Sequence, residues 1–469
     1  MKTKKVFFSF ILCLAFMTSW GQDITGDWNG VLEVKGFQLR LIFHIHKSGD
    51  SYSATMESPD QNAKGIPVTS INFEPPTLKL SVSNAGIEYE GTAGADGNIT
   101  GTFRQRGQSF PLNLTRAPVE KKELRRPQEP AKPYPYLEEE VSFENREAGI
   151  RLAGTLTLPK KEGRFPAVVL ISGSGAQNRD EELLGHKPFL IIADYLTRNG
   201  IAVLRFDDRG TAASTGDFKK ATTADFSTDV EAAVKYLLTR KEINQKQIGL
   251  IGHSEGGNIA PMVAARSKDI AFIVLLAGTG IPGDKLILLQ TEAIRRASGV
   301  SEEYLQEEIS FSRSIHDLIL QSTGKEDFQT VAPARIKELI AKYPAVKPAN
   351  VSEDVFIDSQ IQNLTNNWIW LQYMLKHNPA VDLEKVKCPV LALNGEKDLQ
   401  VPAKINLEAI RTALLKGGNK KVTIIALPGL NHLFQESETG LRSEYGTIEQ
   451  TFSPIALQEI LKWITAQIN

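Results

Sequence analysis

The sequence predicts an α/β fold, a mostly parallel sheet covered by helices on both faces, preceded by a small all-β domain. From residue 141 onward, short continuous apolar runs alternate with helical segments, as is typical of parallel strands buried on both sides. Before residue 117, apolar and polar residues alternate with a period of two, which indicates half-buried antiparallel strands. A proline-rich stretch separates the two patterns.

The bulk properties are those of a globular protein. The 469 residues exceed the size of one ordinary domain, and 41% of them are hydrophobic. The 54 Lys and Arg residues nearly balance the 55 Asp and Glu residues, so no excess of positive charge indicates nucleic-acid binding.

The first 21 residues have the pattern of an export signal. A basic start, MKTKK, precedes an apolar run that is too short for a comfortable membrane span. Small residues before Gln22 indicate cleavage there, which predicts an exported mature protein, periplasmic or secreted, without a stable membrane span. An uncleaved anchor or a lipoprotein modified at Cys13 is the alternative, although bulky residues precede Cys13 where a lipid attachment site needs small ones.

Residues 22–116 are predicted to form the all-β domain, a small antiparallel barrel or sandwich. Period-two alternation marks strands in FQLRLIFHI, TLKLSVS and IEYEGTA, and glycine-containing turns separate them. The segment 26–28 is similar to the Gly-x-Trp start of lipocalin-like barrels, so a ligand-holding barrel is one interpretation; an accessory domain without its own chemistry is preferred. His44 and His46 share a strand face, but no third ligand is evident and no metal site is predicted.

A linker and a larger domain follow. Residues 117–137 contain five prolines, a density that prevents regular helix and favours an extended connector. Residues 138–469 carry the apolar strand runs. About 105 residues separate two of these runs, more than one crossover needs, and their helical patterns predict a cap insertion over residues 281–386.

The segment GHSEG, residues 252–256, places a serine between glycines where an apolar strand gives way to a helix. In this context G-x-S-x-G is the nucleophile elbow, a turn so tight that Cβ atoms at Gly252 and Gly256 would collide with backbone. The turn lifts the Ser254 hydroxyl clear of the sheet, at a helix N-terminus that favours developing negative charge. Ser254 is therefore predicted to be a nucleophile.

A serine nucleophile needs a base, which in turn is oriented by an acid. In this strand–turn–helix arrangement the acid and then the histidine follow the serine along the chain. Of the seven histidines, His432 fits, because it lies in the loop after the last apolar run. Asp398 is the preferred acid, because it lies beyond the turn in NGEKDLQVP, whereas Glu396 would project from that turn into solvent.

The transition state of acyl transfer carries an oxyanion, which two preorganised N–H groups must stabilise. The backbone N–H of Glu255, directly after the nucleophile, is expected to supply one of them. The loop LISGSGAQNRD is expected to supply the other through the backbone N–H of Ser174, with Gly173 keeping the loop open.

Residues 140–469 resemble the α/β-hydrolase superfamily. Five segments follow an order similar to that of bacterial serine esterases near the dienelactone hydrolase and acyl-peptidase branches: SGSGAQNRDE, RFDDRGTAASTGDF, GHSEGG, NGEKDLQVP and GLNHLF. The resemblance implies ester hydrolysis through an acyl-enzyme with no metal or organic cofactor, by Ser254, His432 and Asp398. The chain departs from true dienelactone hydrolases, which use a cysteine, and its β segment is too short for the propeller of prolyl peptidases.

Two further segments each have two interpretations. FDDRG, residues 206–210, is either a salt-bridged loop that holds the sheet edge or a part of the catalytic machinery. The first interpretation is preferred. Trp368, Trp370 and Tyr373 either line an acyl pocket or pack within the cap.

Three functions are compatible with this pattern. The preferred one is an exported carboxylesterase acting on small-molecule esters, acylated carbohydrates being one class. The alternative is a serine aminopeptidase or acylaminoacyl-peptidase, which would need carboxylates placed for a substrate ammonium, and no Glu-Glu signature for this is evident. A ligand-binding protein with an inert hydrolase domain is the third, and the complete Ser–Asp–His set argues against it.

Overall fold

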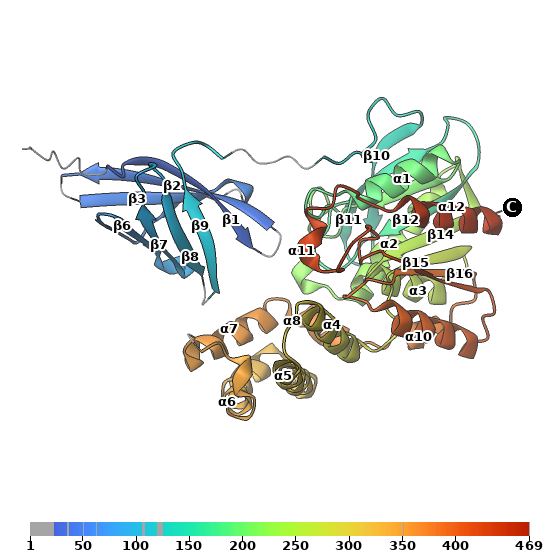
Figure 1. The fold of residues 1–469 in the computed structure, drawn as a ribbon. Helices are drawn as coiled ribbons and strands as arrows, with labels where there is room; N and C mark the ends of the chain where they lie inside the picture. Colours follow the sequence, from blue (N-terminus) through green and yellow to red (C-terminus); the bar gives the residue numbers. More distant parts are fainter. Residues whose placement is uncertain are drawn as a thin grey trace, which may run out of the picture. The chain divides into compact units, whose positions relative to one another are not determined.

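The computed structural model describes residues 23–34, 37–49, 51–61, 63–105, 108–119, 125–349 and 351–468 (Figure 1). The chain divides into two compact units, residues 1–122 and 123–469. The predicted signal peptide, residues 1–21, and its cleavage point lie outside the described residues. None of the helices in the described ranges is long and apolar enough to cross a membrane.

The first unit is all-β, as the period-two alternation predicts. Its antiparallel strands are β1 (Gly26–Val34), β2 (Phe37–Ser48), β3 (Ser51–Ser58), β4 (Ala63–Pro67), β5 (Ser70–Glu74), β6 (Thr77–Val82), β7 (Ile87–Ala93), β8 (Ile99–Gln105) and β9 (Gln108–Leu114). They form two sheets, ordered β1-β2-β3-β4 and β5-β6-β7-β8-β9. A bridge between Asn29 and Thr115 joins the sheets at one edge. At the other edge, Val68 bonds to the first sheet and Thr69 to the second, so the unit is barrel-like.

The interior of this unit is a packed core. Leu41, Phe43 and Ile45 alternate along β2 and are at most 4% exposed, because a strand turns every second side chain inward. Trp28 is buried as well; its Nε1 donates to the carbonyl of Ile24 at 2.8 Å. The guanidinium of Arg116 stacks 3.9 Å from the centroid of the Trp28 ring.

Of the two histidines on β2, His44 contacts two carboxylates. His44 Nδ1 lies 2.6 Å from Asp27 Oδ1, and its Nε2 lies 3.6 Å from Glu57 Oε1. His46 is exposed. Among the described residues, no group of three or more His, Cys, Asp or Glu side chains is arranged to hold a metal ion.

The second unit is built on a sheet of order β10-β11-β13-β12-β14-β15-β16-β17. Its strands are β10 (Leu137–Asn145), β11 (Ile150–Leu158), β12 (Phe165–Ile171), β13 (Ala202–Phe206), β14 (Ile243–His253), β15 (Phe272–Leu276), β16 (Val390–Gly395) and β17 (Val422–Leu427). β11 pairs antiparallel with both β10 and β13, and the pairs from β13 through β17 in this order are parallel. This is the mostly parallel sheet of an α/β-hydrolase fold, and the predicted fold class is confirmed.

Helices cover both faces of this sheet (Figure 1). On one face lie α2 (Thr223–Thr239), α3 (Gly256–Arg266) and α10 (Ala403–Lys416); on the other lie α1 (Pro188–Arg198) and α12 (Pro454–Ile468). Along β12, Val169 and Ile171 pack in the first layer, whereas Val168 and Leu170 pack in the second. The strands are continuously apolar because each of their faces is buried under helices.

A helical insertion lies between β15 and β16. It comprises α4 (Gly283–Ala297), α5 (Glu302–Gln321), α6 (Lys325–Lys342), α7 (Glu353–Thr365), α8 (Trp368–Lys376) and α9 (Ala380–Leu383). Most of these helices share a hydrophobic cluster of their own, which includes Phe311, Phe328, Ile336 and Trp368. The insertion therefore packs as a cap with a separate core.

The proline-rich segment is tied to the second unit. Residues 125–136 form neither helix nor strand. The Arg126 guanidinium donates to the carbonyls of Leu184 and Ile448 at 2.9 and 2.8 Å. Gln128 Nε2 donates to the carbonyl of Phe452 at 2.6 Å. This half of the predicted linker is held by specific backbone contacts.

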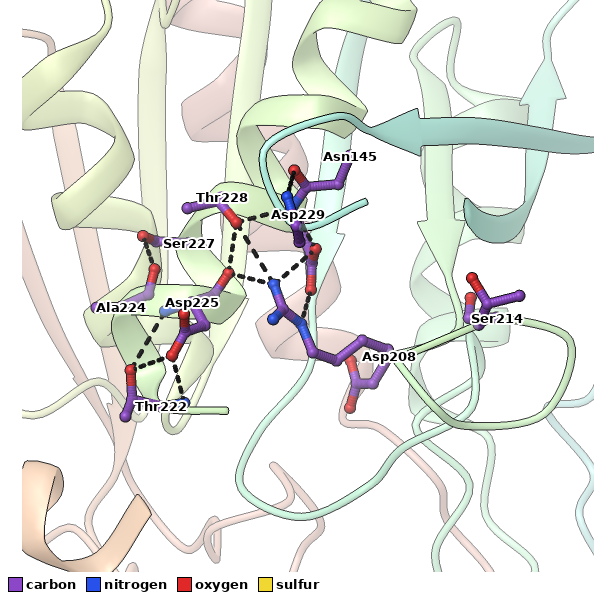
Figure 2. Close-up of polar contacts among 12 residues, drawn as sticks. Asn145, Asp208, Ser214, Thr222, Ala224, Asp225, Ser227, Thr228 and Asp229 are labelled. Atoms are coloured by element: carbon purple, nitrogen blue, oxygen red, sulfur yellow. Dashed lines mark hydrogen bonds and ion pairs between the residues drawn. The ribbon is translucent and has the colours of Figure 1, made fainter. Parts of the chain in front are cut away.

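The FDDRG loop after β13 is held by a buried ion pair. The Arg209 guanidinium makes two hydrogen bonds with the Asp229 carboxylate, at 2.7 and 2.9 Å, and both side chains are buried. Figure 2 shows that Asn145, at the end of β10, also donates to Asp229, at 2.7 Å. The helix α2 that carries Asp229 begins with a capping box between Thr222 and Asp225, visible in the same view. One carboxylate thus joins a sheet edge, a loop and a helix.

The Asp229→Asn variant is expected to lose about 3–5 kcal/mol of unfolding free energy, because it leaves the Arg209 charge buried without a counter-charge. Chemical denaturation followed by circular dichroism measures this loss. The matched control is Glu231→Gln on the same helix, whose partner Arg266 is half exposed, and it should cost at most about 1 kcal/mol. Equal losses in the two variants would contradict the role of the buried pair.

Candidate active site

A cavity of about 370 Å³ opens at the carboxyl edge of the parallel strands. Ser174, Ser254, Glu255 and His432 all line it. They come from the loops that follow β12, β14 and β17 and from the start of α3, which meet because the carboxyl ends of parallel strands share one edge. Asp398, the fifth residue predicted for the site, lies behind His432 and is 2% exposed.

The nucleophile turn is as tight as the sequence predicts. A Cβ atom on Gly252 would overlap the carbonyl of Gly256, and one on Gly256 would overlap the carbonyl of Ile171. Ser254 itself has φ +52°, a left-handed conformation that costs free energy in a non-glycine residue. Its N–H donates to the carbonyl of Leu276 at 2.8 Å, which secures the turn against β15.

The predicted base and acid are in contact. His432 Nδ1 lies 2.8 Å from Asp398 Oδ2. The other oxygen of Asp398 accepts the backbone N–H groups of Gln400 and Val401, both at 2.8 Å, so the carboxylate is fixed on both sides. Glu396, the rejected acid, is exposed. Ser254 and His432 line the same cavity, and among the described residues the hydrogen bond of the His432 ring is the one to Asp398. Catalytic hydrogen bonds are often long before substrate binds and tighten in the substrate complex.

The two expected oxyanion donors lie in segments next to Ser254. The N–H of Glu255 stands immediately before α3, and Ser174 lies in the loop after β12. That loop approaches the nucleophile closely, since a Cβ on Gly173 would lie 3.2 Å from Ser254 Cβ. The N–H of Gly173 donates to Glu181 Oε1 at 2.7 Å, which leaves the Ser174 N–H as the better candidate in this loop.

The side chain of Glu255 has a structural role that the sequence did not indicate. Its carboxylate accepts Trp370 Nε1 from the cap at 2.8 Å and Thr223 Oγ1 from the start of α2 at 2.7 Å. Burial raises the pKa of Glu255, and the hydrogen bonds from Thr223, Trp370 and Ser174 oppose this rise. The residue after the nucleophile therefore connects the elbow, the oxyanion loop and the cap.

The cap aromatics divide between the two interpretations that the sequence leaves open. Trp370 lines the cavity, together with Leu286, Ile287 and Met374 from α4 and α8. Trp368 instead packs in the cap core, and Tyr373 stacks on His377 with ring centroids 5.6 Å apart. The cap thus supplies an apolar wall opposite the polar sheet edge.

A second acidic group braces the loop after β12. Asp208 accepts Ser172 Oγ at 2.7 Å and the Gln177 N–H at 2.9 Å. Burial raises the pKa of Asp208 to about 8, the nearby carboxylates of Glu181 and Glu255 add to the rise, and the two hydrogen bonds oppose it. Asp208 belongs to the scaffold of the loop, in line with the preferred interpretation of FDDRG.

A second histidine–carboxylate pair lies beside the first. His253, the residue before the nucleophile, contacts Glu181 at 2.9 Å and the carbonyl of His432 at 3.0 Å. The sequence shows both residues, in GHSEG and NRDEE, but no spacing rule brings positions 72 residues apart together.

A family of known proteins matches the part of the chain that carries most of this site. Residues 148–411, more than half of the chain, match the family model described as X-Pro dipeptidyl-peptidase (S15 family). The chain belongs to this S15 family. The resemblance to the serine esterase group of the α/β-hydrolase superfamily is confirmed.

Individual relatives of this S15 member include esterases. Esterase EstD of Thermotoga maritima is 26% identical over 298 residues, which are 63% of this chain and 61% of that protein. Human acyl-coenzyme A thioesterase 1 is 30% identical over 131 residues, 28% of this chain and 27% of that protein. The chain therefore spans less than two thirds of the length of these relatives.

Two of the solved structures to which this S15 member is similar are the following. The Pyrococcus furiosus esterase Pf2001 has a TM-score of 0.43 at 15% identity, covering 71% of this chain and 94% of that one. Est1E from Butyrivibrio proteoclasticus, solved with ferulic acid bound, has a TM-score of 0.41 at 18% identity, covering 70% and 99%.

The Asp208→Asn variant should alter the pH dependence of stability. A carboxyl group whose pKa rises on folding contributes stability that is full below its unfolded pKa of about 4 and is lost as pH rises through about 8. An amide can accept the Gln177 N–H and donate to Ser172 without titrating. The melting temperature of wild type should therefore fall relative to that of the variant between pH 6 and pH 9. If the melting temperatures of wild type and variant instead change in parallel between pH 6 and pH 9, Asp208 is ionised over the whole range.

Proposed function

We propose that this hydrolase is an exported serine carboxylesterase that cleaves small-molecule esters through an acyl-enzyme. The observation that carries the proposal is the strained Ser254 turn on the wall of a cavity that also contains His432, itself bonded to the buried Asp398 at 2.8 Å. Nothing in this arrangement calls for a cofactor, because the three side chains supply a nucleophile, a base and its orienting acid.

The proposed reaction has two half-reactions. His432 accepts the proton of Ser254 as the hydroxyl attacks the ester carbonyl, and Asp398 stabilises the resulting imidazolium. The N–H groups of Ser174 and Glu255 stabilise the oxyanion. His432 then protonates the leaving alcohol, and water repeats the sequence on the acyl-enzyme.

The cavity favours a substrate with an apolar part. Leu286, Ile287, Trp370 and Met374 from the cap face the polar loops of the sheet edge. An acyl chain against the cap would leave the ester carbonyl near Ser254, since apolar surface is stabilised by burial. Acyl groups on carbohydrates are one substrate class within this proposal, and the relative named esterase EstD supports ester hydrolysis in general.

A peptidase is the second candidate, because the family is described as X-Pro dipeptidyl-peptidase. Such an enzyme would need free carboxylates to bind a substrate ammonium. Among the residues that the structure describes, two carboxyl groups line the cavity, those of Glu181 and Glu255. Both already accept hydrogen bonds from within the protein, which favours the esterase.

Export is the remaining element of the proposal, and it rests on the N-terminal pattern of residues 1–21. N-terminal sequencing of the protein secreted or released from the periplasm should begin at Gln22. A mature N-terminus at Met1, or a lipid on Cys13, would contradict cleavage before Gln22 and would support an anchored protein instead.

The Ser254→Ala variant should lose ester hydrolysis, because no other hydroxyl occupies the turn. The Asp398→Asn variant should lower kcat by about 10⁴-fold, since the amide orients the wrong tautomer of His432. Both are measured with p-nitrophenyl butyrate. Glu396→Gln, an exposed acid two residues from Asp398, is the control and should retain wild-type kcat. Full activity in Ser254→Ala would end the proposed mechanism.

A substrate panel separates the two candidate functions. p-Nitrophenyl acyl esters of increasing chain length should be cleaved with far higher kcat/KM than aminoacyl and X-Pro p-nitroanilides. An apolar cap wall predicts that kcat/KM first rises with acyl length and then falls when the chain outgrows the cavity. Efficient anilide cleavage without preference for esters would support the peptidase instead.

A further inference from the structure

The second histidine–carboxylate pair connects three segments of the active site. His253 ends β14 and is 6% exposed. Its Nδ1 lies 2.9 Å from Glu181 Oε1, and its Nε2 lies 3.0 Å from the backbone carbonyl oxygen of His432. The same Glu181 oxygen accepts the N–H of Gly173 at 2.7 Å. The loops after β12 and β17 are thereby tied to the residue before the nucleophile.

The chemistry of these contacts constrains the protons. A backbone carbonyl only accepts, so Nε2 of His253 must carry a proton. An ionised carboxylate also only accepts, so Nδ1 must donate to Glu181. Both ring nitrogens are then protonated, and the pair consists of an imidazolium and a carboxylate. The competing arrangement is a neutral His253 that accepts a proton held by Glu181.

The surroundings favour the charged arrangement. Burial lowers the pKa of His253, but the charge and hydrogen bond of Glu181 outweigh this effect, and the carbonyl of His432 and the charge of Asp398 act in the same direction. From the other elements, the His432 ring faces His253 with centroids 4.9 Å apart, and the buried Asp208, whose pKa is raised to about 8, lies near Glu181. An uncompensated imidazolium would be costly here, whereas the pair is neutral overall.

We propose that His253 is a protonated positioning residue, which with Glu181 holds the backbone of His432 and the N–H of Gly173 and so sets the base and the oxyanion loop around Ser254. The proposal rests on the proposed esterase function and adds a second carboxylate–imidazole pair to it. His253 does not exchange a proton with substrate, because both of its ring nitrogens are occupied. Its effect reaches the reaction through the main chain.

The protonation state is tested without activity. In the full-length protein labelled with ¹⁵N-histidine, NMR at pH 8 should show a histidine with both ring nitrogens protonated, whereas an ordinary histidine is neutral at this pH. This signal should vanish in His253→Gln, which assigns it, and in Glu181→Gln. A wild-type spectrum in which His253 is neutral at pH 8 would overturn the proposal.

The positioning role is tested by kinetics. In Glu181→Gln the amide oxygen can still accept the Gly173 N–H, but it carries no negative charge to neutralise a protonated His253. Displacement of the base and the oxyanion loop by a fraction of an ångström should lower kcat by about 10–100-fold, with little change in KM. Glu182→Gln, the same change at the exposed neighbouring residue, is the matched control and should be indistinguishable from wild type.

The outcomes separate this proposal from the esterase function. A wild-type protein without esterase activity would end the proposed function, while the NMR result for His253 would stand by itself. An active wild type with Glu181→Gln at wild-type kcat would overturn the positioning role and leave the esterase intact. If Glu181→Gln does not fold, the wild-type spectrum alone decides the protonation state.

Discussion

The turn at Ser254 is the constraint on which the rest of the site depends. The chain must pass from β14 into α3 so sharply that neither Gly252 nor Gly256 can carry a Cβ atom, and Ser254 adopts φ +52°. Such a conformation persists only where the surroundings over-determine it. Here the N–H of Ser254 bonds to β15, and Gly173 lies against its side chain. The strain has a function, because it exposes the hydroxyl beside a helix N-terminus.

Buried carboxyl groups surround this turn, and each fixes a segment next to it. Asp398 fixes His432, Glu255 accepts from the cap through Trp370, and Asp208 braces the loop after β12. A buried carboxyl group is tolerated only with donors around it, so each one enforces the position of the groups that it bonds. Glu181 follows the same rule with His253 and Gly173. The acids around the nucleophile therefore hold neighbouring segments together through hydrogen bonds.

The strands, the elbow and the Asp398–His432 contact were predictable from sequence, because apolar runs, glycines at fixed offsets and chain order report local geometry directly. The side-chain roles of Glu255 and Glu181 were not, since each depends on a partner more than 70 residues away. Trp370 and Trp368 show the same limit: two positions apart in one helix, they divide between the cavity and the cap core. The packing of residues 125–136 also depends on backbone carbonyls, which no sequence pattern reveals.

Covalent labelling tests the central claim most directly. A fluorophosphonate reacts with a serine only where a base activates the hydroxyl and N–H donors stabilise the adduct. Peptide mass spectrometry of the labelled full-length chain should place one adduct, on Ser254. A chain that stays unlabelled, or that carries its adduct on another serine, would contradict the assembly of Ser254, His432 and Asp398 into one reactive site.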